Sequence, residues 1–334
     1  MQKKNSMVQK YLTPEIYQDL QGIVSVSGVT IDQLIRSGQQ HTDSSIGVYA
    51  GDAECYSVFS KLLDKIICDY HNVDKLCGHN SNFHYVGKKH SALSSKLIKS
   101  TRVRVARNLK GFAFPSVITS DQRLKVEDKI VSVLEKLTGN LKGDYFSLSC
   151  MSESGRCQLI AEHLLFKEGD RFLASAGINR DWPAGRGIFI ARNRKFIVWV
   201  NEEDHLRVIS MQAGGELLEV FEVLKEGLNA FAGKLYFAYD QRLGFLNSCP
   251  SNIGTGMRAS MHLQLKNIID HNDFSKQCDK LNLSVRGVHG EHSQSEDGIV
   301  DISNKFRFAI TEAEIIQTLL MGAAELLAWE NSTS

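Results

Sequence analysis

Strict alternation of polar and apolar residues from Ser100 to Arg107 is the feature that most limits how this chain can fold. The run reads S-T-R-V-R-V-A-R, and a period of two is typical of a half-buried β-strand. Successive side chains of a strand point to opposite faces, so Arg102 and Arg104 share one face and valines occupy the other. Two adjacent arginines repel each other unless an anion joins them or they lie at a solvated edge. Their close spacing favours a phosphate site.

The run from Cys249 to His262 combines several groups that suit phosphate chemistry. It reads C-P-S-N-I-G-T-G-M-R-A-S-M-H, and alternating apolar residues at its end predict that it leads into a strand. Backbone N–H groups of the glycine turn, with Arg258 at its edge, suit a phosphate. A thiol beside an arginine can be ionised at neutral pH, which makes Cys249 a candidate thiolate. The alternative is a buried structural cysteine before an ordinary proline turn.

Charged and polar residues also follow the ends of two other predicted strands. The apolar run from Phe196 to Val200 leads directly into N-E-E-D-H-L-R at 201–207, which puts three carboxylates and an arginine at the edge of the core. The alternative for this acidic run is a solvated turn. Residues 286–298 form a glycine-rich polar loop after a strand predicted at 281–285. Such a loop can fold over a ligand and exclude water.

The first 70 residues carry helical patterns instead. Thr13-Pro14 and the pair Thr30 and Gln33 are helix-start signals, and apolar residues recur at helical spacing from Val58 to Ile67. The small polar loop 43–52 between them is expected to be exposed, and it is either a specificity loop or a plain connector. Residues 72–99 are polar and predict a linker, or a poorly packed crossing between domains. Further helices are predicted at 121–140, 157–166, 216–228 and 313–329, and further strands at 208–212 and 261–265.

Composition is that of a globular protein and argues against several classes of partner. Lysine plus arginine number 39 and aspartate plus glutamate 38, so the net charge of +1 draws the chain toward neither nucleic acid nor membranes. No apolar run reaches the roughly 18 residues of a membrane span, and the N-terminus shows no secretory signal. The 7 cysteines are scattered without a C-x-x-C pair. We therefore expect a cytoplasmic protein with reduced thiols and no zinc site.

Five blocks together resemble the phosphagen (ATP:guanido) kinases, and they follow that family's order over most of residues 30–330. The blocks are Ser100-Thr-Arg-Val-Arg104, Asn201-Glu-Glu-Asp-His-Leu-Arg207, Cys249 to His262, Arg286-Gly-Val-His-Gly-Glu-His292 and Asp301-Ile-Ser-Asn-Lys305. The resemblance implies an α+β fold, in which a small all-helical N-terminal domain precedes a larger domain with an antiparallel sheet of about eight strands flanked by helices. We place the helical guanidino-specificity domain at 1–75, a linker at 76–99 and the catalytic domain at 100–334.

The family moves the γ-phosphoryl group of ATP reversibly onto a guanidinium nitrogen, and phosphoryl transfer depends on positioning and on neutralising phosphate charge. The resemblance makes one group of residues the nucleotide site, with the last two near the base and ribose: Arg102, Arg104, Arg207, Arg258, Arg286, His163 and His262. It also implies that Mg²⁺ is carried mainly by ATP oxygens and water, so no metal site built from protein ligands is expected.

On the guanidino side, Glu203 and Glu291 match the two carboxylates that clamp the substrate. A guanidinium is protonated at neutral pH, so a carboxylate can orient it and accept the proton that leaves. Cys249, as a thiolate, matches the residue that contacts the guanidinium, with Arg258 as one possible source of a lowered pKa. The loop at 43–52 matches the segment that holds the rest of the substrate, through Ser45, Ile46, Gly47 and Tyr49. Asp43 and Arg171 match a pair that ties this loop to the large domain.

The choice of guanidine is a separate prediction. The short loop with Tyr49, and Glu291, resemble the branch of the family that uses arginine, whereas Ala50-Gly-Asp52 is closer to branches that use taurocyamine, lombricine or glycocyamine. Val288 and His289 depart from the arginine branch. We predict a cytoplasmic enzyme, monomer or homodimer, that phosphorylates L-arginine. The alternatives are another guanidino kinase, creatine kinase included, or a weakly active nucleotide-binding relative. A protein-arginine kinase of bacterial type would lack the helical region at 1–70.

Overall fold

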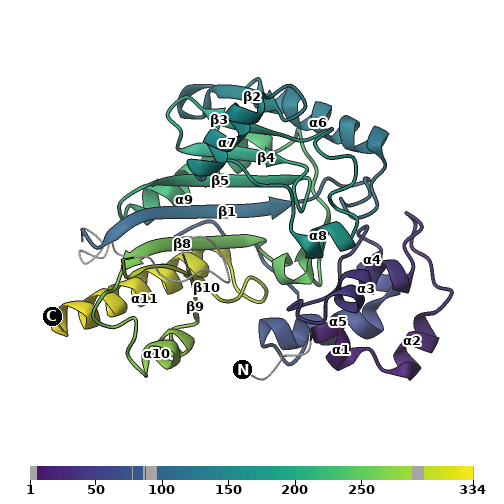
Figure 1. Ribbon diagram of the computed structural model, residues 1–334, viewed down its shortest axis with the longest axis horizontal. Coiled ribbons are helices and arrows are strands. Elements are labelled where there is room, and N and C mark those ends of the chain that lie inside the picture. Colours follow the sequence, from purple (N-terminus) through teal and green to yellow (C-terminus); the bar gives the residue numbers. More distant parts are fainter. Residues whose placement is uncertain (1–5, 77, 86, 88–95, 288–296, 334) are drawn as a thin grey trace.

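The computed structural model describes residues 6–76, 78–85, 87, 96–287 and 297–333. A helical N-terminal region packs beside an eight-stranded antiparallel sheet with flanking helices, which confirms the predicted α+β fold (Figure 1). Glu291, Val288 and His289, on which several predictions depend, lie outside the described residues.

Five helices form the N-terminal region as far as it is described. The predicted helix starts are confirmed: the Thr13 side chain accepts a hydrogen bond from the Ile16 N–H, and Thr30 and Gln33 form a capping box. These side chains satisfy N–H groups that a helix leaves unpaired at its start. The helices are α1 (Met7–Tyr11), α2 (Pro14–Leu20), α3 (Ile31–Gln40), α4 (Cys55–Val58) and α5 (Ser60–His71).

The eight-stranded sheet has the strand order β2-β3-β4-β5-β1-β8-β10-β9, and all its neighbours are antiparallel. The predicted strand with alternating arginines is its central strand β1. The strands are β1 (Ile98–Arg107), β2 (Gly143–Ser147), β3 (Gly187–Ala191), β4 (Phe196–Val200), β5 (Leu206–Ala213), β8 (Met257–Gln264), β9 (Leu283–Gly287) and β10 (Ile299–Asn304), with a separate pair β6 (Tyr239–Asp240) and β7 (Gly244–Phe245).

One face of the sheet is apolar and is covered by helices. Val103 and Val105 of β1 are fully buried there, in a single core with the apolar sides of the covering helices, whose burial drives this packing. The helices are α6 (Ser120–Leu134), α9 (Leu217–Phe231), α10 (Phe274–Lys280) and α11 (Glu312–Ser332), with the 3₁₀ turns η2 (Gly139–Leu141) and η3 (Pro250–Asn252) in loops. The other face therefore carries the alternate residues, including Arg102 and Arg104.

Helix boundaries near residue 160 differ from the sequence prediction. The helix predicted at 157–166 is α7 (Glu153–Ala161), which ends before His163, a residue with a positive φ of 58°. Leu164 to Phe166 instead pack against Trp199 in a small second core on the polar face of the sheet. Tertiary burial of these three residues overrides the helical pattern. A short helix that was not predicted, α8 (Arg171–Ser175), follows.

The described part of the predicted linker is held against the large domain. Glu312, which is fully buried at the start of α11, accepts hydrogen bonds from the Ser81 hydroxyl (2.9 Å) and the Asn82 N–H (2.7 Å). Phe83 stacks on Phe221 of α9 with ring centroids 5.6 Å apart. These contacts fix residues 78–84 on the sheet domain, in contrast to the poorly packed crossing that their polarity suggested.

Candidate active site

Strand register gathers the predicted phosphate-binding arginines on one face of the sheet. Arg104 of β1 lies directly opposite Arg258 of β8. Arg207 of β5 lies opposite Ala106, two residues from Arg104 and therefore on the same face. Asp301 of β10 lies between its partners His262 on β8 and Arg286 on β9. Residues that are up to 184 positions apart in the chain, from Arg102 to Arg286, thus share one surface.

Two of these arginines, Arg102 and Arg104, are crowded by their cationic neighbours. The Arg102 guanidinium lies over the Trp199 ring at 5.2 Å, and its buried Nε and Nη2 have no hydrogen-bond partner among the described residues. Burial and then the neighbouring Arg207 and Arg258 lower the pKa of Arg102 to about 10. The same causes hold the pKa of Arg104 well below its ordinary value. Crowded, half-buried cations, one of which (Arg102) has unused donors, favour a polyanion at this surface.

Carboxylates partly balance these cations. Arg207 donates from Nη1 to Glu202 and from Nη2 to Glu203, each at 2.9 Å, and Arg258 donates to Asp301 at 2.8 Å. Burial raises the pKa of Glu203 to about 7, although Arg207 opposes this shift. A carboxylate with a pKa near neutrality is suited to accept a proton.

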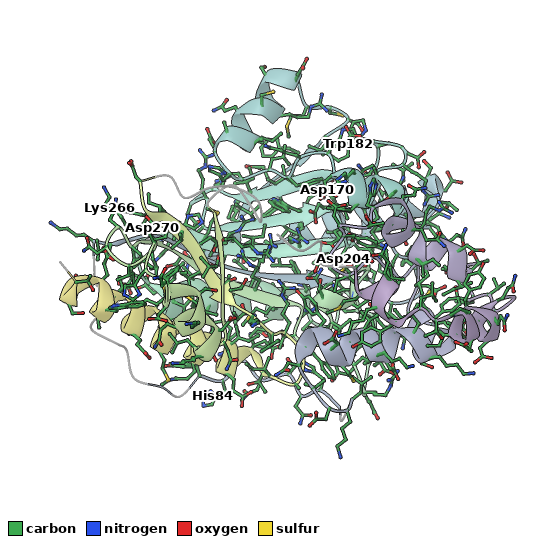
Figure 2. All side chains as sticks on the ribbon, turned by 60° about the horizontal axis from the view of Figure 1, so that its bottom comes forward. His84, Asp170, Trp182, Asp204, Lys266 and Asp270 are labelled. Atoms are coloured by element: carbon green, nitrogen blue, oxygen red, sulfur yellow. The ribbon has the colours of Figure 1, made fainter. Side chains whose placement is uncertain are left out.

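The residue after Glu203 supports the site without lining its cavity. Asp204 is buried and accepts hydrogen bonds from the Asn108 amide (2.7 Å), the Ser248 N–H (2.7 Å) and the Asn247 amide (3.0 Å). Asp204 therefore joins the acidic turn to the segment that carries Cys249. In Figure 2 the labelled Asp204 and Asp170 lie where the sheet meets the N-terminal helices.

The surroundings of Cys249 correct one prediction. Its side chain is buried, with Sγ 3.1 Å from the Ser251 hydroxyl oxygen. Burial and then the nearby Glu203 raise the pKa of Cys249 to about 12, so the thiol is not pre-ionised by Arg258. Arg258 pairs with Asp301 instead. The spacing of nine residues in the sequence had suggested that Arg258 lies next to Cys249. In the structure, Arg258 lies on strand β8 beside Asp301.

One cavity of about 370 Å³ brings both halves of the predicted site together. Its lining includes residues from each predicted group: Arg104, Arg207, Arg286, Glu203, Cys249, Ser45, Ile46 and Tyr49. Gly47 does not line the cavity. It adopts a φ of +83° and packs closely against Gly38 of α3, which shapes the loop.

The remaining predicted nucleotide residues lie beside this cavity on the same face. His262 accepts or donates a hydrogen bond with the Ser100 hydroxyl at 3.0 Å. Burial first, and then Arg258, Arg102 and His163, lower the pKa of His262, so His163 is close enough to act on it. The two histidines thus share the end of the face away from Cys249.

Several cavity residues escaped the sequence analysis. Arg307 is buried and donates to the Ser251 carbonyl (2.7 Å) and to Asn252 Oδ1 (2.8 Å), which fixes it beside the Cys249 loop. Its place just after the block at 301–305 was the available signal. Ser44, Ser251 and Asn252 belong to segments that the sequence analysis singled out, although they were not named as site residues. The rest carry no local signal: Tyr70, Asp170, Phe172 and Leu173.

The N-terminal region is bonded directly to the Cys249 segment. The Ala50 N–H donates to the Ser248 carbonyl (2.7 Å), and the Tyr56 hydroxyl donates to the Asn247 carbonyl (2.6 Å). The predicted pair of Asp43 and Arg171 is confirmed as an ion pair between the loop and α8. The loop at 43–52 is therefore one wall of the cavity.

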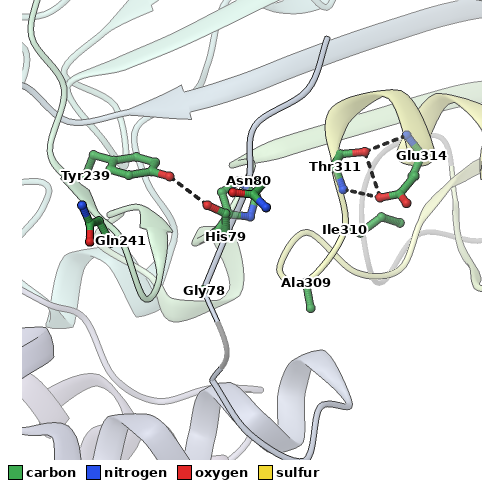
Figure 3. A pocket seen from close by; sticks show the side chains of 9 residues that line it. All are labelled: Gly78, His79, Asn80, Tyr239, Gln241, Ala309, Ile310, Thr311 and Glu314. Atoms are coloured by element: carbon green, nitrogen blue, oxygen red, sulfur yellow. Dashed lines mark hydrogen bonds between the residues drawn. The ribbon is translucent and has the colours of Figure 1, made fainter. Parts of the chain in front are cut away.

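A second cavity of about 660 Å³ lies between the segment at 78–80 and the start of α11 (Figure 3). Glu314 is the one charged residue among its described lining residues, and its carboxylate already accepts hydrogen bonds from Thr311 N–H and Oγ1. The described residues that line this cavity include no lysine or arginine that could bind a phosphate. The described residues also contain no cluster of three or more His, Cys, Asp or Glu suited to a metal ion.

Comparison with known proteins agrees with this geometry. Residues 2–68 match the ATP:guanido phosphotransferase N-terminal domain, and residues 125–333 match the C-terminal catalytic domain of that family. An arginine kinase of Anthopleura japonica is 46% identical over 97% of this chain, which spans 46% of that protein. An arginine kinase of Amphioctopus fangsiao is 43% identical over 99% of this chain and 96% of its own length.

Solved structures show the same fold. The duplicated taurocyamine kinase of Schistosoma mansoni superposes with a TM-score of 0.93 at 38% identity, over 99% of this chain and 48% of that one. A lombricine kinase gives 0.92 at 37% identity, over 99% and 93%. Each described helix of this chain is too short or too polar to cross a membrane. With both domains matched, and with cationic and acidic walls meeting in one cavity, the chain belongs to the ATP:guanido phosphotransferase family, the guanidino kinases.

Proposed function

We propose that this chain is an arginine kinase, which transfers the γ-phosphoryl group of Mg-ATP reversibly to the guanidinium of L-arginine. The observation that carries the proposal is the single cavity lined by Arg104, Arg207 and Arg286 on one side and by Glu203 and Cys249 on the other. A triphosphate on the arginines and a guanidinium against the acid and the sulfur would meet in line. Such positioning supplies most of the catalysis in phosphoryl transfer.

In this proposal the arginine face takes the place of water around the phosphates. Arg102, with its unused donors, and Arg104 and Arg258 would bind phosphate oxygens through charge-assisted hydrogen bonds. His163 and His262 would lie near the base and ribose. Mg²⁺ would be held by phosphate oxygens and water, and it would further neutralise the charge that develops during transfer.

Glu203 and Glu291 would hold the guanidinium by paired hydrogen bonds. One guanidinium N–H proton must leave as nitrogen attacks phosphorus, and Glu203, with its pKa of about 7, is suited to accept it. The cationic substrate would also oppose the burial that keeps Cys249 protonated, because an adjacent positive charge favours the thiolate.

The part of the cavity lined by the loop at 43–52 favours an amino acid substrate. Ser45 and Ile46 line it, and no hydrogen bond from their main-chain N–H groups occurs among the described residues, so these donors would suit an α-carboxylate. Asp170 lines the same cavity and would attract an α-ammonium. Taurocyamine and glycocyamine lack that ammonium group. The similarity to arginine kinases also favours arginine, whereas the structural likeness to taurocyamine and lombricine kinases keeps those substrates as the second candidate.

A coupled assay with ATP and a panel of guanidines tests the proposal. We expect turnover of L-arginine well above that of taurocyamine, lombricine, glycocyamine and creatine. Turnover of one of the others instead would transfer the proposal to that substrate, and no turnover with any guanidine would favour a nucleotide-binding relative. Asp170→Asn should weaken arginine more than taurocyamine, since only arginine carries the α-ammonium. Glu291→Gln and Cys249→Ala should lower turnover more than ATP affinity, and unchanged rates would remove those residues from the mechanism.

A further inference from the structure

A separate cavity of about 190 Å³ lies between the N-terminal region and the large domain. Arg36 of α3 lines it from one side, and Arg180, in the loop after α8, lines it from the other. Tyr49 lines both this cavity and the 370 Å³ active-site cavity, so it forms the wall between them. We refer to this cavity of about 190 Å³ as the Arg36–Arg180 cavity.

Positive charge dominates the Arg36–Arg180 cavity. Its described lining residues include two arginines and no carboxylate. Among the described residues, Arg180 donates to carbonyl oxygens only, those of Gly177 (2.8 Å), Ser116 (3.2 Å) and Ile118 (2.9 Å). Burial and then Arg123 lower the pKa of Arg180. Asp181 opposes this shift, and Arg36 adds a smaller lowering effect. The two guanidiniums therefore lie close enough to repel each other.

Two neighbouring carboxylates, Asp181 and Asp52, already have partners. Asp181 pairs with the buried Arg123, whose Nε and Nη2 remain without partners among the described residues. On the N-terminal side, Asp52 is buried and already accepts hydrogen bonds from Ser25 Oγ, Ser27 N–H and the Cys55 N–H. Arg123 and Arg180 on the large-domain side thus exceed Asp181 in charge. None of the described residues that line the cavity is a carboxylate.

Neutral donors complete the lining. The Gln33 side chain is held by its oxygen, which accepts a hydrogen bond from the Thr30 N–H (3.0 Å), so its amide NH₂ group is left to donate. Ser27 and Ser116 add hydroxyl groups, although the Ser116 hydroxyl already donates to the Ala50 carbonyl. Two guanidiniums with amide and hydroxyl donors are the groups that bind tetrahedral oxyanions in proteins.

We propose that the Arg36–Arg180 cavity is a binding site for inorganic phosphate, distinct from the nucleotide site. Its volume is below the roughly 300 Å³ at which pockets for drug-sized ligands begin, so a nucleotide does not fit and a single phosphate does. Phosphate bound there bridges α3 to the loop after α8. It thereby holds the two domains together around Tyr49, which is part of the substrate loop at 43–52.

Isothermal titration with inorganic phosphate, at a constant chloride background, tests the site without any guanidine or nucleotide. The parent protein should bind phosphate at two classes of site, the arginine face and this cavity. Arg36→Gln should lose one class, or weaken it at least fivefold, and Arg36→Lys should restore part of it. Arg192→Gln removes an exposed arginine elsewhere on the large domain and should keep both classes. Arg104→Gln should lose the other class.

Arg36 is exposed, so Arg36→Gln is expected to fold, which circular dichroism verifies. An Arg36→Gln isotherm identical to that of the parent overturns the proposal, as does equal loss in Arg192→Gln. The effect on the substrate loop rests on the proposed function and is read separately. Phosphate should change the KM for the guanidine more in the parent than in Arg36→Gln, which keeps only the effect of phosphate at the arginine face. Because phosphate binding is measured without substrate, the titration tests the site even if the enzyme turns over no guanidine.

Discussion

Arg104 on β1 and Arg258 on β8 are directly opposed cross-strand neighbours on the same face of the sheet. Like charges in this position destabilise a sheet by roughly 0.2–1 kcal/mol, and burial adds to the cost. Arg258 has Asp301 as a partner, whereas Arg104 faces the active-site cavity and has a pKa held well below its ordinary value by burial and by other arginines. The protein thus holds two like charges opposite each other, and a bound polyanion would reduce their repulsion.

Replacing Arg104 should therefore separate stability from function. We expect Arg104→Gln to keep or raise the free energy of unfolding by up to about 1 kcal/mol, because the repulsion is lost. The same variant should bind ATP about 10 to 100 times more weakly, since a charged hydrogen bond to phosphate contributes roughly 1.5–3 kcal/mol. Thermal unfolding with and without ATP measures both effects. A loss of stability without a loss of ATP binding would show that Arg104 is structural.

The pKa of Glu203 predicts how activity depends on pH. Glu203 must be ionised to accept a proton, and burial raises its pKa to about 7 in the free protein. The value of kcat/KM for the guanidine should therefore rise as the pH increases through about 7 and level off above it. Glu203→Gln should reduce turnover by roughly 10²–10⁴-fold and abolish this rise. Glu202→Gln is the matched control, and an equal loss there would move the role to the neighbouring acid.

The same carboxyl group predicts a stability effect with a definite sign. Its pKa is about 7 in the folded protein against an ordinary 4.5, so the folded state binds the proton more tightly. Its contribution to stability is complete below pH 4.5 and is lost as the pH rises to 7, by roughly 3 kcal/mol for the difference between these two values. The free energy of unfolding of the parent relative to Glu203→Gln should fall over this range in urea titrations. A constant difference would mean that Arg207 keeps the group ionised throughout.

The ion pair of Asp43 and Arg171 should affect substrate binding more than folding. Both side chains are more than half exposed, so solvent screens the pair and it adds little to stability. It connects the substrate loop to α8, however, so Asp43→Asn and Arg171→Gln should each raise the KM for the guanidine a few-fold. A double-mutant cycle should show that the two effects are not additive. The effects should shrink at high salt, and additive, salt-independent effects would rule out the pair as the cause.

Gly38 allows α3 to approach the substrate loop. A Cβ atom at Gly38 would overlap the Val8 side chain and lie 2.8 Å from the Cα of Gly47. Helix propensity alone favours alanine by up to about 1 kcal/mol, but overpacking against backbone costs roughly 1–3 kcal/mol. Gly38→Ala should therefore destabilise the protein and raise the KM for the guanidine. Gly155→Ala in the exposed helix α7, where the nearest atom is 3.2 Å away, should be neutral or stabilising.

Local sequence patterns determined most of the secondary structure and which residues of a strand share a face. The alternation at 100–107 assigned Arg102 and Arg104 to one side of a strand, and the capping residues Thr13 and Thr30 marked helix starts that the structure confirms. These features depend on neighbours within a few residues, which the sequence displays directly. Resemblance to a family, carried by five short blocks, supplied the fold and the grouping of residues that lie far apart.

Only the tertiary structure decided which charges meet and how they titrate. Strand register, set by the packing of whole faces, put Arg104 opposite Arg258 and Arg258 beside Asp301, away from Cys249. Burial by segments that are remote in the sequence raised the pKa of Cys249 and Glu203. The fold also placed Tyr70 and Arg307 in the lining of the active-site cavity. Desolvation and through-space charge depend on three-dimensional neighbours, and no spacing along the chain encodes them.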